Sequence, residues 1–353
     1  MTRTISTVMG TLLTAGTALF GSWAESQACS RVLYVGDDNI LRIVGRSLDW
    51  KTPIPTNIYV YPRGMAKVGD NGDRPMTWTS KYGAVYAVGY DSGVTEGMNE
   101  KGLVVNGLFC KGTVYHKPEA GDVNKKTMSL AMFVAWMLDQ HADTPELVAA
   151  LKSEPFILGG STFDGGTVTA LHWGISDAQG RSAVLEYVDG VMNIHEGQDI
   201  HVLTNDPTYL EMQAIEKYWE GIGGVNFLPG GVRSPDRFVR ASFFAKNVDH
   251  SSDPDIGLAI CRSIVANVSV PYHYNIEGEP NVSSTQWRSF SETPALKYWF
   301  DIVTNHGIFY VSLKECNLQP GAPVMKLDTS ESKEYVGDAT SRMFVTTPFK
   351  PQY

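Results

Sequence analysis

The first regular hydrophobic pattern in the chain is a pair of short apolar runs separated by a polar turn. Residues 31–35 and 40–45 are rich in Val, Leu and Ile, and residues 36–39 read Gly-Asp-Asp-Asn, which is typical of a tight turn. This pattern predicts a β-hairpin. Similar runs predict further strands at residues 57–61, 84–90, 103–108, 167–176 and 182–188.

Helices are predicted where apolar residues recur every three or four positions. In residues 128–139, Leu130, Phe133 and Met137 follow this spacing. The segment 144–146, Thr-Pro-Glu, supplies a cap residue, a proline at the first helical position and an acid in the first turn, so a second helix is predicted through residue 151. Two more helices are predicted at residues 208–218 and 237–246.

The order of these elements, strands before helices before strands, predicts two stacked sheets with helical layers outside. Residues 228–235 and 275–285 are expected to be loops, because they are rich in Pro, Gly and polar residues. Neither loop is long enough to link two domains, and no internal repeat divides the sequence. Residues 29–353 are therefore expected to form a single domain.

The amino end has the pattern of a leader peptide. Residues 8–20 are apolar and uncharged, but they are too few for a comfortable membrane span. Ser26 and Ala28 are small residues at the two positions that a signal peptidase inspects, so cleavage after Ala28 is predicted. The alternative is a buried core helix. Residues 1–28 are thus expected to be a signal peptide that directs the chain to the periplasm, with no stable membrane insertion after its removal.

Composition and charge narrow the class of partner. The chain is 43% hydrophobic and 19% charged, which is ordinary for a folded protein, and its formal net charge is −9. Nucleic-acid binding depends on Lys and Arg facing phosphates, and no basic stripe occurs here. A small-molecule partner is expected.

The four cysteines, at positions 29, 110, 261 and 316, are widely spaced. They form no CxxC pair and have no histidines at metal-ligand spacing, so no metal site is predicted. An exported chain with four cysteines has enough for two disulfides. If Cys29 is reserved for chemistry, at most one disulfide can form among the other three, and the sequence does not choose the pair.

Cys29 would become the first residue of the mature chain. It would then carry a thiol and a free α-amine, and an amine with a pKa of about 7.7–8.0 can accept the thiol proton near neutral pH. Two other readings are a lipoprotein, whose Cys is acylated, and a cysteine that merely begins the first strand. Ser26 and Gln27 argue against the lipoprotein, because such signals favour a branched apolar residue three positions before the Cys.

Arg46 and Asp49 close the predicted hairpin, where their side chains can return close to Cys29. In such a turn an Arg can hold a thiolate by its charge, while an Asp accepts hydrogen bonds from the α-amine and orients it. A surface ion pair is the alternative reading for an Arg and an Asp three residues apart.

Six segments in order resemble the choloylglycine hydrolase family, which contains the penicillin V acylases and the bile salt hydrolases. The resemblance extends over nearly the whole predicted mature chain, into the aromatic segment 296–300. The segments are Cys29, RSLDW at 46–50, MNEKGL at 98–103, LHWGISDAQGRSAVLEY at 171–187, LTNDPTY at 203–209 and RFVRAS at 237–242.

The resemblance implies an N-terminal nucleophile (Ntn) hydrolase of the α+β class, a four-layer αββα sandwich that cleaves amides through a thioester without a metal or cofactor. Cys29 matches the nucleophile, and Arg46 and Asp49 match its basic and acidic partners. Asn205 matches the side-chain donor of the oxyanion hole and Arg237 the second arginine of the site. The alternative for Asn205 is a loop residue that bonds to its own backbone.

Two aromatic residues bear on the substrate. Trp50 could form an aromatic wall for an acyl group, although a Trp beside a turn is also ordinary packing. Phe109 stands where bile salt hydrolases typically have Asn and some penicillin acylases Tyr, so a side-chain donor is lost and the pocket should be less polar. The family's oxyanion contribution at that place is a backbone N–H.

The leader and a short segment between Asn205 and Arg237 look like the Gram-negative branch of the family. That branch favours penicillin V, cleaved to 6-aminopenicillanic acid and phenoxyacetate, over bile salts. Bile salts and N-acyl homoserine lactones remain alternative substrates, and a periplasmic binding protein or lipoprotein on this fold is the non-enzyme alternative. The resemblance also implies a homo-oligomer such as a tetramer, but the short segment leaves the number of subunits open.

Overall fold

The computed structural model describes residues 29–153, 156–159, 162–163, 167–274 and 283–353. The predicted signal peptide, residues 1–28, lies outside the described residues, as does most of the predicted loop at 275–285.

A seven-stranded sheet carries the beginning of the predicted mature chain. Its strands are antiparallel except for the last pair. In spatial order they are β16 (Val202–Leu203), β1 (Ser30–Val35), β2 (Arg42–Trp50), β17 (Ser284–Glu292), β18 (Lys297–Ile302), β19 (Phe309–Ser312) and β21 (Gly337–Asp338).

A nine-stranded antiparallel sheet packs against it. Its strands are β15 (Val191–Gly197), β14 (Ser182–Val188), β13 (Leu171–Ser176), β8 (Val104–Phe109), β7 (Gly93–Asn99), β6 (Ala84–Gly89), β3 (Thr56–Tyr61), β20 (Val324–Leu327) and β22 (Phe344–Thr346). Three two-stranded pairs flank it: β4 (Ala66–Val68) with β5 (Thr77–Thr79), β9 (Lys126–Ser129) with β10 (Phe156–Gly159), and β11 (Thr162–Phe163) with β12 (Thr167–Val168).

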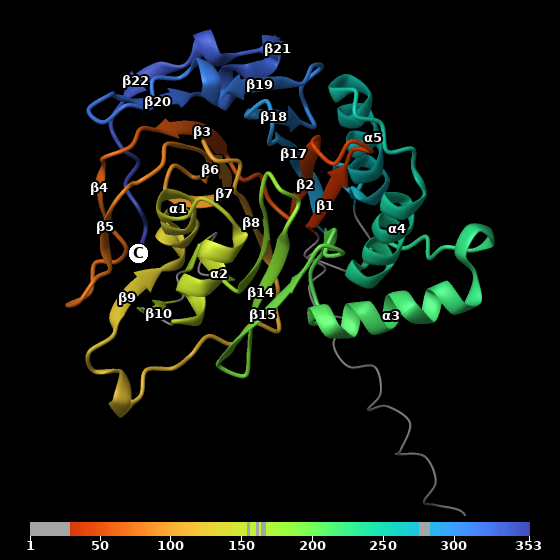
Figure 1. Cartoon of the computed structure of the whole chain (residues 1–353), viewed down its shortest axis with the longest axis horizontal. Coiled ribbons are helices and arrows are strands. Elements are labelled where there is room, and N and C mark those ends of the chain that lie inside the picture. Colours follow the sequence, from red (N-terminus) through yellow and green to blue (C-terminus); the bar gives the residue numbers. More distant parts are fainter. Residues whose placement is uncertain (1–28, 154–155, 160–161, 164–166, 275–282) are drawn as a thin grey trace, which may run out of the picture.

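The α-helices of the described residues form the outer layers. They are α1 (Leu130–Gln140), α2 (Thr144–Lys152), α3 (Tyr209–Ile222), α4 (Ser234–Asn247) and α5 (Pro254–Val268). Figure 1 shows α4 and α5 beside β1 and β2, whereas α1 and α2 lie over the strands of the nine-stranded sheet. Helix α3 packs along α4.

Three separate hydrophobic clusters correspond to the three contacts between four layers. One joins α1 and α2 to the nine-stranded sheet and includes Phe133 and Trp173. A second, with Val44 and Ile58, fills the space between the sheets. The third, with Val265, joins the seven-stranded sheet to α4 and α5. The expected αββα architecture is therefore confirmed, and burial of these apolar faces is its main driving force.

The sequence predicted that residues 46–50 close a turn, and this prediction is wrong: they continue β2 as far as Trp50. The segment has no Gly or Pro to stop the strand, and its apolar residues alternate with polar ones while all of them are buried. Because β2 runs antiparallel to β1, with Ser30 opposite Ser47, its second half passes alongside Cys29. The predicted proximity thus arises from strand pairing.

Other boundaries also differ from the predictions. The strand predicted at 167–176 is interrupted at residues 169–170, and residues 128–129 belong to β9 rather than to the following helix. Residues 284–285 lie in β17 and not in a loop. Helix α5 was missed, although Asp253 caps it by accepting hydrogen bonds from the backbone N–H groups of Asp255 and Ile256.

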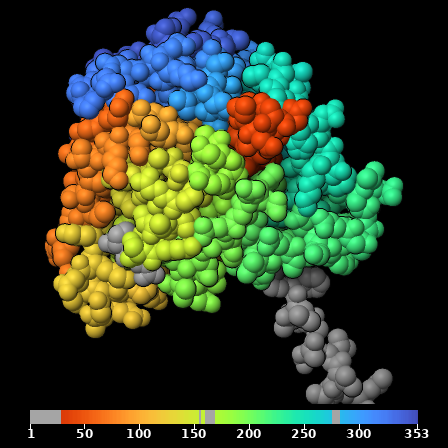
Figure 2. All heavy atoms as spheres, in the orientation of Figure 1, coloured from red at the N-terminus to blue at the C-terminus, as the bar shows by residue number. Residues whose placement is uncertain are grey.

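Segments far apart in sequence meet at the surface. Figure 2 shows the red tip of the first hairpin against the teal residues that follow α4. There the N–H of Asp37 donates to the carbonyl of His250. Among the described residues, no helix combines the length and apolar character needed to cross a membrane.

Candidate active site

Cys29 lies immediately before β1 and is 4% exposed. Its Sγ is 3.7 Å from Nη2 of Arg46 and 3.9 Å from the carbonyl oxygen of Asp49. The thiol therefore faces a cation and the backbone of β2. The antiparallel pairing of β1 and β2 makes this arrangement possible.

Arg46 is held on several sides. Its Nη2 donates to the carbonyl of Gly107 at 3.0 Å, and Nη1 lies 3.2 Å from Oε2 of Glu96. Its guanidinium stacks over the ring of Trp287 at 4.6 Å from the centroid. With both Arg46 and Glu96 almost fully buried, this is an internal ion pair and not the surface pair that the sequence alone allowed.

Glu96 is a component of the site that sequence reasoning missed. It lies in the interior of β7, is fully buried, and accepts hydrogen bonds from the hydroxyl groups of Ser289 and Tyr298. Burial and the Glu96 carboxylate raise the pKa of Tyr298 well above its ordinary value. An acid inside a predominantly buried strand was the available signal.

Asp49 is also fully buried. Its carboxylate accepts hydrogen bonds from the hydroxyls of Thr285 at 2.5 Å and Ser47 at 3.3 Å. Burial raises its pKa to about 6, even though the charge of Arg237 and the Thr285 hydrogen bond act in the opposite direction. The carboxylate is therefore easier to protonate than an ordinary Asp.

Asn205 and Arg237 bind the backbone of Cys29. Oδ1 of Asn205 accepts from the N–H of Cys29 at 2.8 Å and from Nη2 of Arg237 at 2.6 Å. Nη1 of Arg237 donates to the Cys29 carbonyl and to the Ser30 hydroxyl, both at 2.6 Å. Burial lowers the pKa of Arg237, and the nearby Asp49 and Cys29 partly offset this effect.

The Cys29 nitrogen bonds to Asn205 and not to Asp49, the acceptor that the sequence predicted. In the uncleaved chain this nitrogen is a peptide N–H with a single hydrogen, and it donates that hydrogen to Asn205. The Nδ2 group of Asn205 donates to the carbonyl of Phe109 at 2.6 Å, which leaves its second hydrogen for another acceptor. Asn205 therefore bonds across the site and not to its own backbone, the alternative that the sequence left open.

The loop that carries Asn205 is fixed by neighbouring groups. The Asn205 N–H donates to Oγ of Ser234, and Nε2 of His172 lies 2.8 Å from the Thr204 carbonyl. His172 also lies 3.3 Å from the carboxylate of Glu186. Burial lowers the pKa of His172, but the neighbouring Cys110 and Glu186 outweigh burial and raise it well above its ordinary value.

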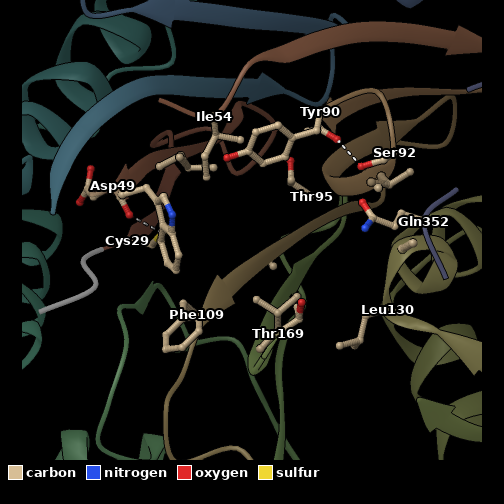
Figure 3. A pocket seen from close by; sticks show the side chains of 18 of the residues that line it. Cys29, Asp49, Ile54, Tyr90, Ser92, Thr95, Phe109, Leu130, Thr169 and Gln352 are labelled. Carbon is tan, nitrogen blue, oxygen red and sulfur yellow. Dashed lines mark hydrogen bonds between the residues drawn. The ribbon is translucent and has the colours of Figure 1, made fainter. Parts of the chain in front are cut away.

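A cavity of about 140 Å³ opens beside Cys29. Trp50 and Phe109, the two residues expected to contact substrate, both line it, with their ring centroids 5.6 Å apart. Figure 3 shows Cys29 and Asp49 at one side and Phe109 on an adjoining wall. The remaining apolar walls come from Leu48, Ile54, Val94, Leu130, Ala131 and Leu171.

All four cysteines are free thiols in this structure, so none of the disulfides allowed by the sequence is present. In the part of the chain that the structure describes, no three His, Cys, Asp or Glu side chains are grouped so that they could hold a metal ion. The chemistry available at the site is that of a thiol, two buried carboxylates, two arginines and an asparagine.

Comparison with known proteins yields a consistent set of matches. The sequence profile of the "Linear amide C-N hydrolases, choloylglycine hydrolase family" matches residues 29–335. A penicillin V acylase of Pectobacterium atrosepticum is 36% identical over 349 residues, covering 93% of each chain. A bile salt hydrolase/transferase of Clostridium perfringens is 27% identical, covering 79% of this chain and 90% of its own length.

A solved structure of a penicillin V acylase from Agrobacterium tumefaciens superposes with a TM-score of 0.84 at 38% identity. The match covers 92% of this chain and 99% of the other. The crystal structure of a mutant conjugated bile acid hydrolase from Clostridium perfringens has a TM-score of 0.72 at 24% identity. It covers 85% of this chain and 96% of the other, and this match is a likeness in fold.

Proposed function

Because this chain belongs to the choloylglycine hydrolase family and is a hydrolase of linear amide C–N bonds, we propose that it removes the acyl group of penicillin V-like N-acyl amides with Cys29 as nucleophile. The observation that carries the proposal is the Cys29 thiol, which lies 3.7 Å from a buried arginine and lines a largely apolar cavity. The family match, which begins at residue 29, supports removal of residues 1–28 before catalysis.

The proposed reaction starts from the free α-amine of Cys29. The amine takes the Sγ proton, and the thiolate attacks the substrate carbonyl carbon, with Arg46 stabilising the negative sulfur. The oxygen of the tetrahedral intermediate accepts a hydrogen bond from the second Nδ2 hydrogen of Asn205 and a backbone N–H. A donor in such a position contributes about 3–4 kcal/mol to catalysis.

Collapse of the intermediate breaks the C–N bond as the proton on the Cys29 amine passes to the leaving nitrogen. The product amine departs and the acyl group stays on Sγ as a thioester. Water then gives a proton to the same amine and attacks the thioester carbon. The C–S bond breaks, the proton returns to sulfur, and the carboxylic acid is released. Arg237 and Asn205 position Cys29 throughout, because they bind its carbonyl and its nitrogen.

Asp49 contributes through charge and position in this proposal. Its buried carboxylate lies within electrostatic reach of Arg237, and its carbonyl lies 3.9 Å from Sγ. Removal of the leader converts the Cys29 nitrogen from one N–H to several, so the amine can bond to further acceptors besides Asn205. Asp49, which the sequence assigned to this role, is the acceptor we propose.

The aromatic and aliphatic walls of the cavity support an apolar acyl group such as phenoxyacetyl. N-acyl homoserine lactones offer the same kind of acyl group, and bile salts a bulkier one, so these are the competing substrates. The similarity to two penicillin V acylases over more than 90% of the chain favours the penicillin. A binding protein without activity is disfavoured, because Cys29, Arg46, Asp49, Asn205 and Arg237 meet in one site.

We further propose that residues 29–353 form the catalytic domain, that the mature enzyme acts in the periplasm, and that it assembles as a homo-oligomer. The cleavage pattern of residues 1–28 supports export. The family resemblance supports assembly, with the number of subunits to be measured by light scattering of the mature protein.

The deciding experiment combines intact-mass analysis of the exported protein with an assay for 6-aminopenicillanic acid after addition of penicillin V. We expect a mature mass that begins at Cys29, and amine release that disappears in Cys29→Ala. Cys316→Ala is the matched control, because it removes a thiol from outside the cavity. A mature chain that starts elsewhere or carries lipid on Cys29 would refute the mechanism, whereas a correct start without amine release would refute the penicillin assignment.

A further inference from the structure

The cavity beside Cys29 has a polar end. Ser92, Thr95 and Gln352 line it, and Figure 3 shows Ser92 and Gln352 on the side away from Cys29 and Asp49, with Thr95 nearer the centre of the view. Gln352 is exposed, and Ser92 and Thr95 are half-buried, so this end of the cavity is open to solvent whereas the Cys29 end is buried. A polar group at the far end of an acyl chain would meet these side chains.

The hydroxyl hydrogens at this end are already used. Oγ of Ser92 donates to the carbonyl of Gly89 at 3.2 Å, and Oγ1 of Thr95 donates to the carbonyl of Ala87 at 3.0 Å. Each oxygen keeps lone pairs that can accept a hydrogen bond, and the Gln352 amide can both accept and donate. The polar end thus offers mainly acceptors to a ligand.

The turn that forms this end is rigidly supported. Tyr90 and Asp91 have φ values of 53° and 51°, a left-handed conformation that side chains other than glycine adopt at a cost. The Ser92 N–H closes the turn on the Gly89 carbonyl at 2.9 Å. The Asp91 carboxylate accepts hydrogen bonds from three anchoring side chains, those of Asn57, Tyr59 and Lys326.

The C-terminal segment is attached to the same turn. The N–H of Gln352 donates to the carbonyl of Ser92 at 2.9 Å. On either side of it, the Phe349 N–H donates to the Tyr61 hydroxyl and the Tyr353 hydroxyl donates to the Val68 carbonyl. Gln352 is therefore held beside the cavity by contacts before and after it in the chain.

The charge around the cavity limits the ligand. Of the described residues that line it, only Arg46 and Asp49 carry charge, and both lie at the Cys29 end. A carboxylate or an ammonium group at the other end would have no lining counter-charge. A neutral group that donates a hydrogen bond fits best, and a hydroxyl is the simplest such group.

We propose that Ser92, Thr95 and Gln352 form a subsite for a hydroxyl group at the far end of the acyl chain, so that the enzyme prefers hydroxylated aryl or alkyl acyl amides. The inference rests on the proposed function, because it places the acyl group in the cavity with its carbonyl at Cys29. The subsite adds a preference for a terminal hydroxyl group on the acyl chain of the substrate.

The test compares three substrates with the same amine: phenoxyacetyl, 4-hydroxyphenoxyacetyl and 4-methylphenoxyacetyl derivatives of 6-aminopenicillanic acid. The methyl group matches the hydroxyl in size but cannot donate. For the wild type we expect kcat/KM to favour the hydroxyl over the methyl substrate by about fivefold, the effect of one net hydrogen bond. In Gln352→Leu and in Thr95→Val the ratio should fall towards one.

Lys350→Met is the matched control, because it alters an exposed side chain of the same C-terminal segment that does not line the cavity; it should keep the wild-type ratio. Equal cleavage of the hydroxyl and methyl substrates by the wild type, or an unchanged ratio in both variants, would overturn the subsite while leaving the acylase function intact. Release of no amine from any of the three substrates would overturn both proposals together.

Discussion

Removal of the Arg46 charge should affect stability and catalysis through two separable interactions. In Arg46→Met the fully buried Glu96, 3.2 Å from Arg46 in the native chain, loses its ionic partner. Loss of one member of a buried pair costs about 3–5 kcal/mol of folding free energy. The double variant Arg46→Met/Glu96→Gln removes both charges and should recover at least half of that loss.

Catalysis should not recover in parallel. A cation 3.7 Å from Sγ stabilises a thiolate by about 4 kcal/mol at an effective dielectric constant of about 20. Both variants lack this cation, so we expect kcat/KM to fall on the order of a hundredfold or more in each.

Urea unfolding followed by circular dichroism measures the first effect, and amine release from penicillin V measures the second, with intact mass to verify that the chain starts at Cys29. Arg240→Met is the control, because Arg240 donates to backbone carbonyls at the edge of α4 and has no part in the cavity. If the double variant is as unstable as the single one, the ion-pair argument is wrong. If it regains activity, Arg46 does not act through its charge.

Three further predictions concern titration and the cavity. Burial raises the pKa of Asp49 from 3.8 to about 6, so its ionisation opposes folding as the pH rises between these values. Asp49→Asn should therefore gain stability relative to wild type by about 3 kcal/mol between pH 3 and pH 8 in urea titrations, and a constant difference would contradict this. Burial tends to raise the pKa of Glu186, but hydrogen bonds from His172 and His195 outweigh burial and lower this pKa to about 2. The interaction of ionised Glu186 with the two histidines therefore stabilises the fold at pH values above 4.5, the pKa of Glu186 in the unfolded chain. The cost of Glu186→Gln should accordingly shrink from pH 6 to pH 3, and a cost that grows would refute the pairing. Trp50→Ala removes one aromatic wall of the cavity and should raise KM for penicillin V at least tenfold with a smaller change in kcat, which initial-rate kinetics would measure; an unchanged KM would exclude substrate contact.

Local patterns were sufficient to predict much of the fold. Short apolar runs identified the first hairpin and the strands at 57–61 and 182–188, since each is bounded by turn residues. The same reasoning ended β2 too early, because nothing local shows that a strand continues between two packed layers. Helix α5 could have been predicted, because Asp253 is a typical cap residue and Pro254 follows it at the first helical position.

The sequence also predicted some residues of the candidate site and not others. Cys29 was identified from its position after the predicted cleavage site, and Arg46 and Asp49 because the first hairpin brings them close to it. Asn205 and Arg237 came only from the family resemblance. Glu96 and Gln352 were not predicted, because their roles depend on contacts between segments that are distant in sequence. The alternation of apolar and polar residues along a strand does not show which strands or segments lie next to it.

The Cys29 contacts in the uncleaved chain bear on how the enzyme becomes active. Asn205, Arg237 and Arg46 already bind Cys29 while its nitrogen is still part of a peptide bond. Under the proposed mechanism, the side-chain partners of Cys29 are therefore in place before residues 1–28 are removed, and cleavage has to supply only the free α-amine.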